Sequence, residues 1–228
     1  MSRENWRASN LLYPLPAVLV SAKGKAGKKT VMTAAWAGTV CSDPVMVSVS
    51  IRKSRYTHEL ISESKEFVLN LTTESMLKAT DYVGVMSGRK IDKFALKGDL
   101  HLTEMESEVV SAPSILESPV CLECKVEQIL ELGSHDMFIA KVVNCNIDQQ
   151  YLDENGRLDL AKAKLIAYSH GEYFSLGKKL GTFGYSVRKK KAKRKSEPKS
   201  EISKKKSSRN KSVTGKRKTA KKGERKRR

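Results

Sequence analysis

The residues best suited to chemistry lie between positions 50 and 59. Three basic and two hydroxyl side chains gather there just after Ser50, namely Arg52, Lys53, Ser54, Arg55 and Thr57. A strand pattern ends at Ile51, and a helical pattern begins near Ser54. The unpaired amides and the positive dipole end of a helix N-terminus suit a dianionic phosphate. The segment therefore predicts a phosphate site, with a solvated basic turn before an ordinary helix as the alternative.

A second segment, residues 30–40, could accommodate a flat ring. Its strand pattern runs into small side chains at Ala34, Ala35, Ala37 and Gly38, which leave room for a ligand against the backbone. Backbone amides there could pair with a heterocycle that carries its own donors and acceptors, such as a flavin. A core strand whose small residues accommodate a packed helix is the alternative, and the pattern alone favours that alternative.

His135 stands in the sequence Gly-Ser-His-Asp, at a tight turn between two strands. Histidine titrates near neutral pH, so this side chain could act in catalysis if it faced a pocket. A lone histidine in a loop is more often an exposed bystander. Both interpretations remain open on the sequence.

The cysteines and glycines form no familiar cofactor motif. Cys121 and Cys124 have CxxC spacing, but residues three apart on a strand point to opposite faces and cannot share a metal ion. The run at 24–30 lacks the Gly-Lys-Thr/Ser of a P-loop and joins two strands. No GxGxxG follows a strand, which argues against a Rossmann nucleotide-binding fold. We expect no metal site.

The elements that would position these residues are mostly strands. Apolar runs and alternation predict strands at 15–22, 29–36, 45–51, 67–71, 120–127 and 137–147, and helical spacing predicts helices at 54–63 and 72–83. Ser54 is the expected cap of the first helix. Residues 120–127 resemble a half-exposed strand, with Glu123 on its outer face. Because most connections are too short for crossover helices, an antiparallel barrel or sandwich is expected.

Charge divides the chain into two parts. The 228 residues carry 44 Lys and Arg against 25 Asp and Glu, a net charge of +19. Residues 188–228 hold 22 of the basic and 3 of the acidic side chains, so residues 1–187 are neutral with 22 of each. We expect one domain at 1–187 and a disordered tail at 188–228 that binds nucleic acid or another polyanion without sequence specificity.

The composition also excludes several classes of protein. Four cysteines are too few for a disulfide scaffold. No apolar run follows the first residues as in a secretory signal, and none reaches the roughly 18–20 residues of a membrane helix. The sequence predicts a soluble, cytoplasmic protein.

Taken in order, several motifs resemble those of the flavin reductase-like family of FMN-binding split barrels, in its flavoredoxin and ferric reductase-type branch. The matching runs are MTAAWAGT at 32–39, CSDP at 41–44, VSVSIRKSRYT at 47–57, FVLNL at 67–71, DYVG at 81–84, SG at 87–88, DKF at 92–94, GSHD at 133–136 and GTFGYS at 181–186. The resemblance covers roughly residues 10–186 and leaves out the tail.

This resemblance implies a mainly β fold, a six-stranded antiparallel split barrel of Greek-key type with a few short helices. It implies a homodimer that binds FMN near the subunit interface. By position, the isoalloxazine ring would lie along Thr33, Ala34, Ala35 and Trp36. The ribityl chain and phosphate would be held by Ser50, Arg52, Lys53, Ser54, Arg55 and Thr57. His135 would lie on the nicotinamide or acceptor side of the flavin, as the candidate catalytic residue.

The activity implied is hydride transfer from NAD(P)H to FMN, followed by electron transfer to free flavin, ferric iron or an electron-transfer protein. An electron carrier that is reduced by another protein has the same sequence features. A non-enzymatic FMN-binding or nucleic-acid-associated dimer, recruited through the basic tail, is the competing interpretation. No membrane partner is expected.

Overall fold

The computed structural model describes residues 2–188. Within this range one compact unit ends at Lys179, and the residues from Leu180 onward belong to a second unit. The described part of the second unit, residues 180–188, includes the short 3₁₀ turn Tyr185–Val187. The predicted disorder and polyanion binding of the tail fall on residues 189–228, which lie outside the described part of the chain. Within residues 2–188 no helix is long and apolar enough to cross a membrane.

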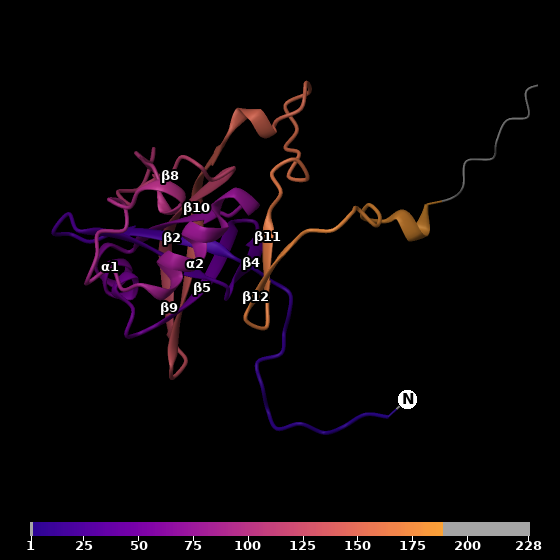
Figure 1. The fold of residues 1–228 in the computed structure, drawn as a ribbon, viewed down its shortest axis with the longest axis horizontal. Coiled ribbons are helices and arrows are strands. Elements are labelled where there is room, and N and C mark those ends of the chain that lie inside the picture. The colour runs from indigo at the N-terminus through magenta and orange to yellow at the C-terminus, as the bar shows by residue number, and fades with distance from the viewer. Residues whose placement is uncertain (1, 189–228) are drawn as a thin grey trace, which may run out of the picture. The chain divides into compact units, whose positions relative to one another are not determined.

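The main sheet is antiparallel throughout and has seven strands in the order β3-β2-β6-β9-β10-β5-β4. Figure 1 labels β2, β4, β5, β9 and β10 of this sheet. Their bounds are β2 Val18–Lys23, β3 Lys29–Ala34, β4 Ala37–Ser42, β5 Val45–Arg52, β6 Glu66–Leu71, β9 Val120–Glu131 and β10 His135–Ile147. The run after residue 24 joins two strands as predicted, because β2 pairs with β3 in a hairpin through the turn at 24–28. The mainly β fold class is confirmed as well.

Smaller elements surround this sheet. A three-stranded sheet contains β1 Leu15–Pro16, β11 Ile166–Ser169 and β12 Glu172–Ser175, and a two-stranded sheet contains β7 Glu104–Met105 and β8 Ser114–Ile115. The helices are α1 Tyr56–Ser64 and α2 Leu77–Val85, with 3₁₀ turns at Glu74–Met76, Gly98–Leu100 and Gln149–Tyr151.

A bend at Ala35 and Trp36 gives the main sheet one strand more than the six expected. The predicted strand 29–36 stops at Ala34, and the chain resumes as β4 at the opposite end of the strand order. The sheet must therefore curl until its two edges approach each other at this bend, as in a barrel. The backbone amide of Ser50 in β5 donates to the carbonyl of Trp36 at 2.9 Å. The small residues thus form a corner, where a continuous strand was predicted.

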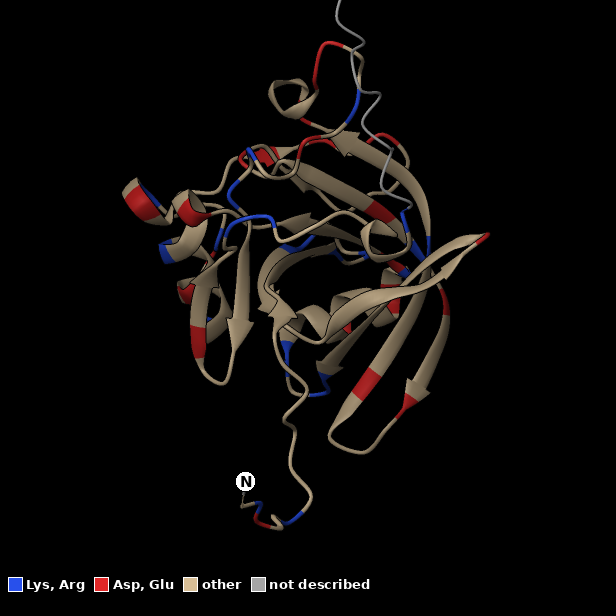
Figure 2. Cartoon of the chain, turned by 90° about the vertical axis from the view of Figure 1, so that its right-hand side faces the viewer, with Lys and Arg blue, Asp and Glu red and all other residues tan. Residues whose placement is uncertain are grey.

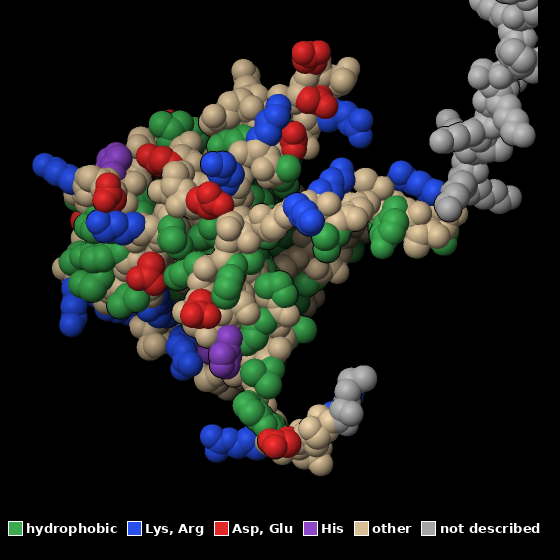
Figure 3. Space-filling model, turned by 45° about the vertical axis from the view of Figure 1, so that its right-hand side comes forward, with side chains coloured by type: hydrophobic (Ala, Val, Ile, Leu, Met, Phe, Trp, Pro, Cys, Tyr) green, Lys and Arg blue, Asp and Glu red, His purple; other side chains and the backbone are tan. Residues whose placement is uncertain are grey.

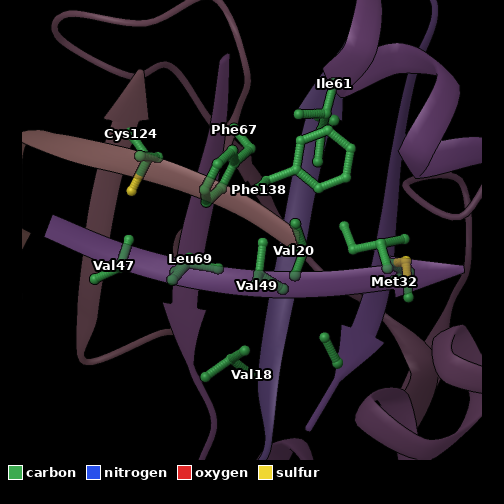
Figure 4. Packing of buried hydrophobic residues seen from close by; sticks show 14 of the residues in the cluster. Val18, Val20, Met32, Val47, Val49, Ile61, Phe67, Leu69, Cys124 and Phe138 are labelled. Carbon is green, nitrogen blue, oxygen red and sulfur yellow. The ribbon is translucent and has the colours of Figure 1, made fainter. Parts of the chain in front are cut away.

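The barrel interior is filled by the inward faces of these strands. Phe67 of β6 and Phe138 of β10 are fully buried, and Ile61 of α1 packs beside the Phe138 ring (Figure 4). Val49 and Ile51 of β5 also point inward, as the alternation predicts. Basic and acidic residues are interspersed along the chain in Figure 2, and the face shown in Figure 3 mixes charges of both signs, in agreement with the neutral balance of residues 1–187.

The predicted exposure of Glu123 is wrong. This β9 side chain is fully buried, because the loop between β7 and β8 covers it. Its carboxylate accepts the backbone amides of Glu108, Val109 and Val110 and the side-chain amide of Asn144. Although burial raises the pKa of Glu123, these hydrogen bonds outweigh burial and leave the pKa below its usual value. A strand pattern cannot reveal a loop that supplies such donors.

The start of α1 also differs from the prediction. Arg55 occupies the N-cap position and Ser54 is an exposed turn residue without a capping bond. The Arg55 amide donates to the carbonyl of Arg52 at 3.0 Å, so a tight turn precedes the helix and delays its start by one residue. At the other predicted helix, a 3₁₀ turn leads into α2, which continues past Gly84.

Candidate functional site

A cleft of about 460 Å³ opens where the β3–β4 bend, the end of β5, the start of β10 and the last turn of α2 meet. Pockets of this size are typical of small-molecule and cofactor sites. Eight of the eleven candidate residues line this cleft: Thr33, Ala34, Ala35, Trp36, Ser50, Arg52, Arg55 and His135. Two segments far apart in the sequence, residues 33–55 and the start of β10, therefore share one cavity.

The other three candidates do not line the cleft. The Lys53 ammonium lies 2.7 Å from a carboxylate oxygen of Glu131 and 3.3 Å from one of Asp136, and the hydrogen bonds to these groups raise its pKa. Ser54 is exposed in the turn, and Thr57 is buried on the first turn of α1. Consecutive residues in a tight turn point in different directions, so these three side chains do not share the cleft that the other eight candidates line.

Two guanidinium groups make the cleft basic. Arg52 is exposed at the end of β5, and Arg55 is half-buried at the start of α1. One Arg55 nitrogen donates to the carbonyl of Gly84 in α2, and burial lowers the Arg55 pKa. Guanidinium groups present several donors in a fixed plane that matches a phosphate. This donor set fits a phosphorylated ligand.

Trp36 and His135 form an aromatic pair on the cleft wall. Their ring centroids lie 4.6 Å apart, with 40° between the ring planes. The Nδ1 atom of His135 lies 2.9 Å from the Ser134 hydroxyl, and His135 is the cross-strand partner of Arg52. Burial, and then the charge of Arg52, lower the pKa of His135. The imidazole is therefore neutral at pH 7 and serves as a polar, aromatic surface.

The last turn of α2 forms another wall, pressed closely against β3. A Cβ atom on Gly84 would lie 3.0 Å from the Cβ of Thr33, and the Thr33 hydroxyl donates to the carbonyl of Thr80. Glycine at position 84 allows this approach, which brings the helix end and Arg55 to the cleft.

The sequence analysis missed a group of tyrosines. Tyr13, Tyr168 and Tyr173 line the cleft, with ring centroids 6.3 Å apart for the first pair and 5.6 Å for the second. The Tyr173 hydroxyl lies 3.3 Å from a carboxylate oxygen of Asp81, and burial, followed by Asp81, raises the Tyr173 pKa to about 12. These residues come from the chain before β2 and from the β11–β12 hairpin. No spacing in the sequence indicates that they meet.

The cysteines of the described residues lie away from the cleft lining. Cys121 packs with Val68 and Ala112, whereas Cys124 lies in the barrel core, so the two side chains belong to different clusters. Burial raises the pKa of Cys124 to about 12, which keeps it a thiol. Across residues 2–188, no group of three His, Cys, Asp or Glu side chains could hold a metal ion.

The family model of the flavin reductase like domain matches residues 10–177, which include all cleft-lining residues. The chain belongs to this family. A protein of Archaeoglobus fulgidus is 35% identical to this chain over 164 residues, covering 72% of this chain and 89% of that protein. The structure of flavoredoxin from Desulfovibrio vulgaris (Miyazaki F) is similar with a TM-score of 0.75 and 31% identity, over 82% of this chain and 100% of flavoredoxin.

A second flavoredoxin, from Methanosarcina acetivorans, has a TM-score of 0.72 and 31% identity over the same shares of the two chains. These matches support a flavin-related oxidoreductase built on a split barrel. The cleft of this flavin reductase-like domain fits a flavin by its own chemistry. It combines guanidinium groups for a phosphate with small residues at the β3–β4 corner and with an aromatic pair.

Proposed function

We propose that the protein is an FMN-dependent oxidoreductase that takes hydride from NAD(P)H and passes electrons to free flavin, ferric iron or an electron-transfer protein. The observation that supports this proposal most directly is the cleft itself. Within the matched domain it combines the guanidinium groups of Arg52 and Arg55 with the small side chains of Ala34 and Ala35. This combination suits a ligand that carries both a phosphate and a flat ring.

The residues have different tasks in this proposal. Arg52 and Arg55 bind the phosphate as charge-assisted donors, and Ser50 adds a hydroxyl. The small side chains at 34 and 35 leave the backbone open to the ring. A bound flavin supplies reversible hydride acceptance, so the chain needs to supply orientation and electrostatics. His135, neutral at pH 7, contacts the second substrate without serving as an indispensable proton donor.

We also propose that the protein forms a homodimer through the side of the sheet that ends in β4. Three apolar side chains on adjacent segments of this side support the proposal, because a large fraction of each is exposed. The exposed fraction is 40% for Trp36, 53% for Val40 and 48% for Val45. Exposed apolar side chains gathered along an edge strand mark interaction surfaces. Since Trp36 also lines the cleft, the dimer contact would adjoin the flavin site.

The first test is anaerobic titration of the FMN-loaded, full-length protein with NADH and then NADPH, followed at the flavin absorbance. Bleaching within seconds supports NAD(P)H oxidation. Bound FMN that remains oxidised favours an electron carrier, a second candidate supported by the two flavoredoxin structures. A protein that does not bind FMN contradicts the proposal and leaves the basic residues 188–228 as the main binding element.

A further inference from the structure

Asp136 is a buried carboxylate to which the proposed function assigns no task. It directly follows His135 and is the second residue of β10. One of its oxygens lies 2.7 Å from Nε2 of His58 on α1, and the other lies 3.3 Å from the Lys53 ammonium. A buried carboxylate is costly unless donors compensate it, and these two donors come from the helix and from the turn before it. The carboxylate therefore joins the start of β10 to the start of α1.

Of the two partners, His58 holds the carboxylate more firmly. Its side chain is 15% exposed, whereas that of Lys53 is 48% exposed, and exposed ion pairs contribute little. Although burial raises the pKa of Asp136, the hydrogen bonds from His58 and Lys53 outweigh burial and leave the pKa below its usual value. The carboxylate is thus ionised at neutral pH and can only accept, so Nε2 of His58 carries the donated proton.

The barrel core fixes the His58 ring from another side. This ring meets the ring of Phe138 edge-to-face, with centroids 5.1 Å apart. Phe138 is fully buried and packs beside Ile61 of α1 (Figure 4). Asp136 and Phe138 are two positions apart on β10 and so lie on one face of the strand. Both contact the same histidine of α1, which leaves little freedom to the strand end.

This contact determines which way His135 points. Successive side chains of a strand lie on opposite faces, so a strand whose Asp136 faces α1 presents His135 to the other face. There the His135 ring lies 4.6 Å from the Trp36 ring, on the wall of the cleft. His135 directly follows the exposed turn residues Gly133 and Ser134, at the kind of strand end that frays first. An anchor one residue further along the strand opposes that fraying.

We propose that His58 and Asp136 form a positioning pair for His135: their hydrogen bond fixes the first residues of β10 on α1, and this directs the His135 ring into the cleft. Neither member of the pair lines the cleft, so the pair acts through His135. Apolar residues in place of a buried polar pair are often neutral for stability, and the best-attested use of such pairs is to select one arrangement of the elements that they join. The inference rests on the proposed function, because His135 contacts the NAD(P)H proposed above.

The first test measures the environment of His135 without turnover. The chain has four histidines, so NMR of the full-length protein with ¹³C-labelled histidine can follow each imidazole, at the same FMN occupancy in every variant. The His135 signal is assigned by its loss in His135→Ala. Burial, and then the charge of Arg52, hold the wild-type His135 pKa below 6.5. His58→Leu removes the donor, and the His135 pKa should then rise toward 6.5.

Two further variants serve as controls for this measurement. His58→Gln keeps a side-chain N–H donor and should keep the wild-type His135 pKa. His101→Leu, at an exposed histidine outside the cleft lining, should keep it as well. If His58→Leu does not fold, the double variant His58→Leu/Asp136→Val provides the same comparison, because it leaves no buried carboxylate without its donor.

A double-mutant cycle tests whether the pair acts through His135. At saturating FMN, His58→Leu should raise KM for NAD(P)H about threefold, with kcat little changed and the FMN dissociation constant within about twofold of wild type. In the His135→Ala background, His58→Leu should have no further effect on KM. A loosened helix would instead weaken FMN binding as much as it raises KM.

The other results contradict the inference. An unchanged His135 pKa in His58→Leu, effects on KM that multiply in the cycle, or an equal loss of FMN affinity would show that His58 does not orient His135, and each would leave the proposed function intact. A protein that binds FMN but never oxidises NAD(P)H contradicts the proposed function, and the NMR comparison still decides whether His58 orients His135.

Discussion

Trp36 and His135 are nearly a hundred positions apart in the sequence, yet their ring centroids lie 4.6 Å apart on one wall of the cleft. Trp36 occupies the bend that carries the chain from one edge of the sheet to the other, and His135 begins β10. Closure of the barrel therefore creates the pair. Because His135 is partly buried beside Arg52, its imidazole is neutral at pH 7.

His135→Ala tests whether this histidine transfers a proton. We expect the variant to retain FMN and to lose less than about tenfold in NAD(P)H oxidation, since general acid–base groups contribute about 10²–10⁴-fold. Steady-state rates with matched FMN occupancy provide the measurement. His101→Ala, which removes an exposed histidine outside the cleft, is the control. Complete loss of oxidation in FMN-loaded His135→Ala would show that the histidine is an essential proton-transfer group.

The variants Arg52→Gln and Lys53→Gln test whether Arg52 contributes to phosphate binding and its neighbour Lys53 does not. Arg52 lines the cleft, whereas Lys53 pairs with Glu131 and Asp136 outside it. A hydrogen bond to a charged group contributes about 1.5–3 kcal/mol, so Arg52→Gln should weaken FMN binding about tenfold to a hundredfold. Riboflavin binding should change little, and Lys53→Gln should bind FMN as wild type does. If both variants lost FMN affinity equally, Lys53 would contribute to FMN binding as much as Arg52 does, which would contradict its placement outside the cleft.

The contrast between Arg52 and Lys53 shows how much of the site could be predicted from the sequence. The composition of residues 50–59 indicated a phosphate site and the small residues at 34 and 35 a flat ligand. Both segments line the cleft, because each lies where a strand ends. The sequence did not reveal which way Lys53, Ser54 and Thr57 point, since side-chain direction in a turn depends on the backbone path.

The errors in the fold have a similar cause. Local periodicity predicted the strands of the main sheet, but the bend at Ala35 and Trp36 lies within an apolar run and breaks no pattern. The burial of Glu123 depends on a loop that supplies three amides. Tyr168 and Tyr173 reach the cleft only because the β11–β12 hairpin pairs with β1 near Tyr13. Such long-range contacts are absent from local sequence patterns.

Gly84→Ala tests the close contact between α2 and β3. The new Cβ would lie 3.0 Å from the Cβ of Thr33, and overpacking of this kind typically costs about 1–3 kcal/mol. Alanine also gains about 1 kcal/mol over glycine in a helix, so we expect a net loss of up to about 2 kcal/mol in the free energy of unfolding. Urea denaturation measures it. Gly177→Ala, where no atom lies within 4 Å of the new Cβ, is the control, and a stabilised Gly84→Ala would contradict the contact.

The lowered pKa of Lys93, a buried residue that follows α2, predicts that the free energy of unfolding depends on pH in an unusual way. Its folded-state pKa of about 8 lies below the ordinary value of 10.5. Between these values the unfolded chain holds a proton that the folded chain has released, so the free energy of unfolding rises with pH in this window. Relative to Lys93→Met, wild type should gain about 1 kcal/mol per pH unit from pH 8 to 10. Denaturant titrations of both proteins check this, and a constant difference would show that the Lys93 pKa is not lowered.

Val40→Lys tests the proposed dimer contact on β4. Val40 is 53% exposed and lies at the register shift between Thr39 and Cys41, so substitution should leave the folded subunit intact. The shift interrupts the regular edge, which favours packing of side chains over extension of the sheet across the interface. A lysine in each copy would bring two charges into an apolar contact, and we expect dimer affinity to fall about tenfold or more.

Sedimentation velocity across a concentration series gives the dissociation constant. Val109→Lys, at a 44% exposed valine in the loop between β7 and β8, should dimerise as wild type does. An equally tight Val40→Lys dimer, or a wild-type monomer, would rule out this surface as the contact.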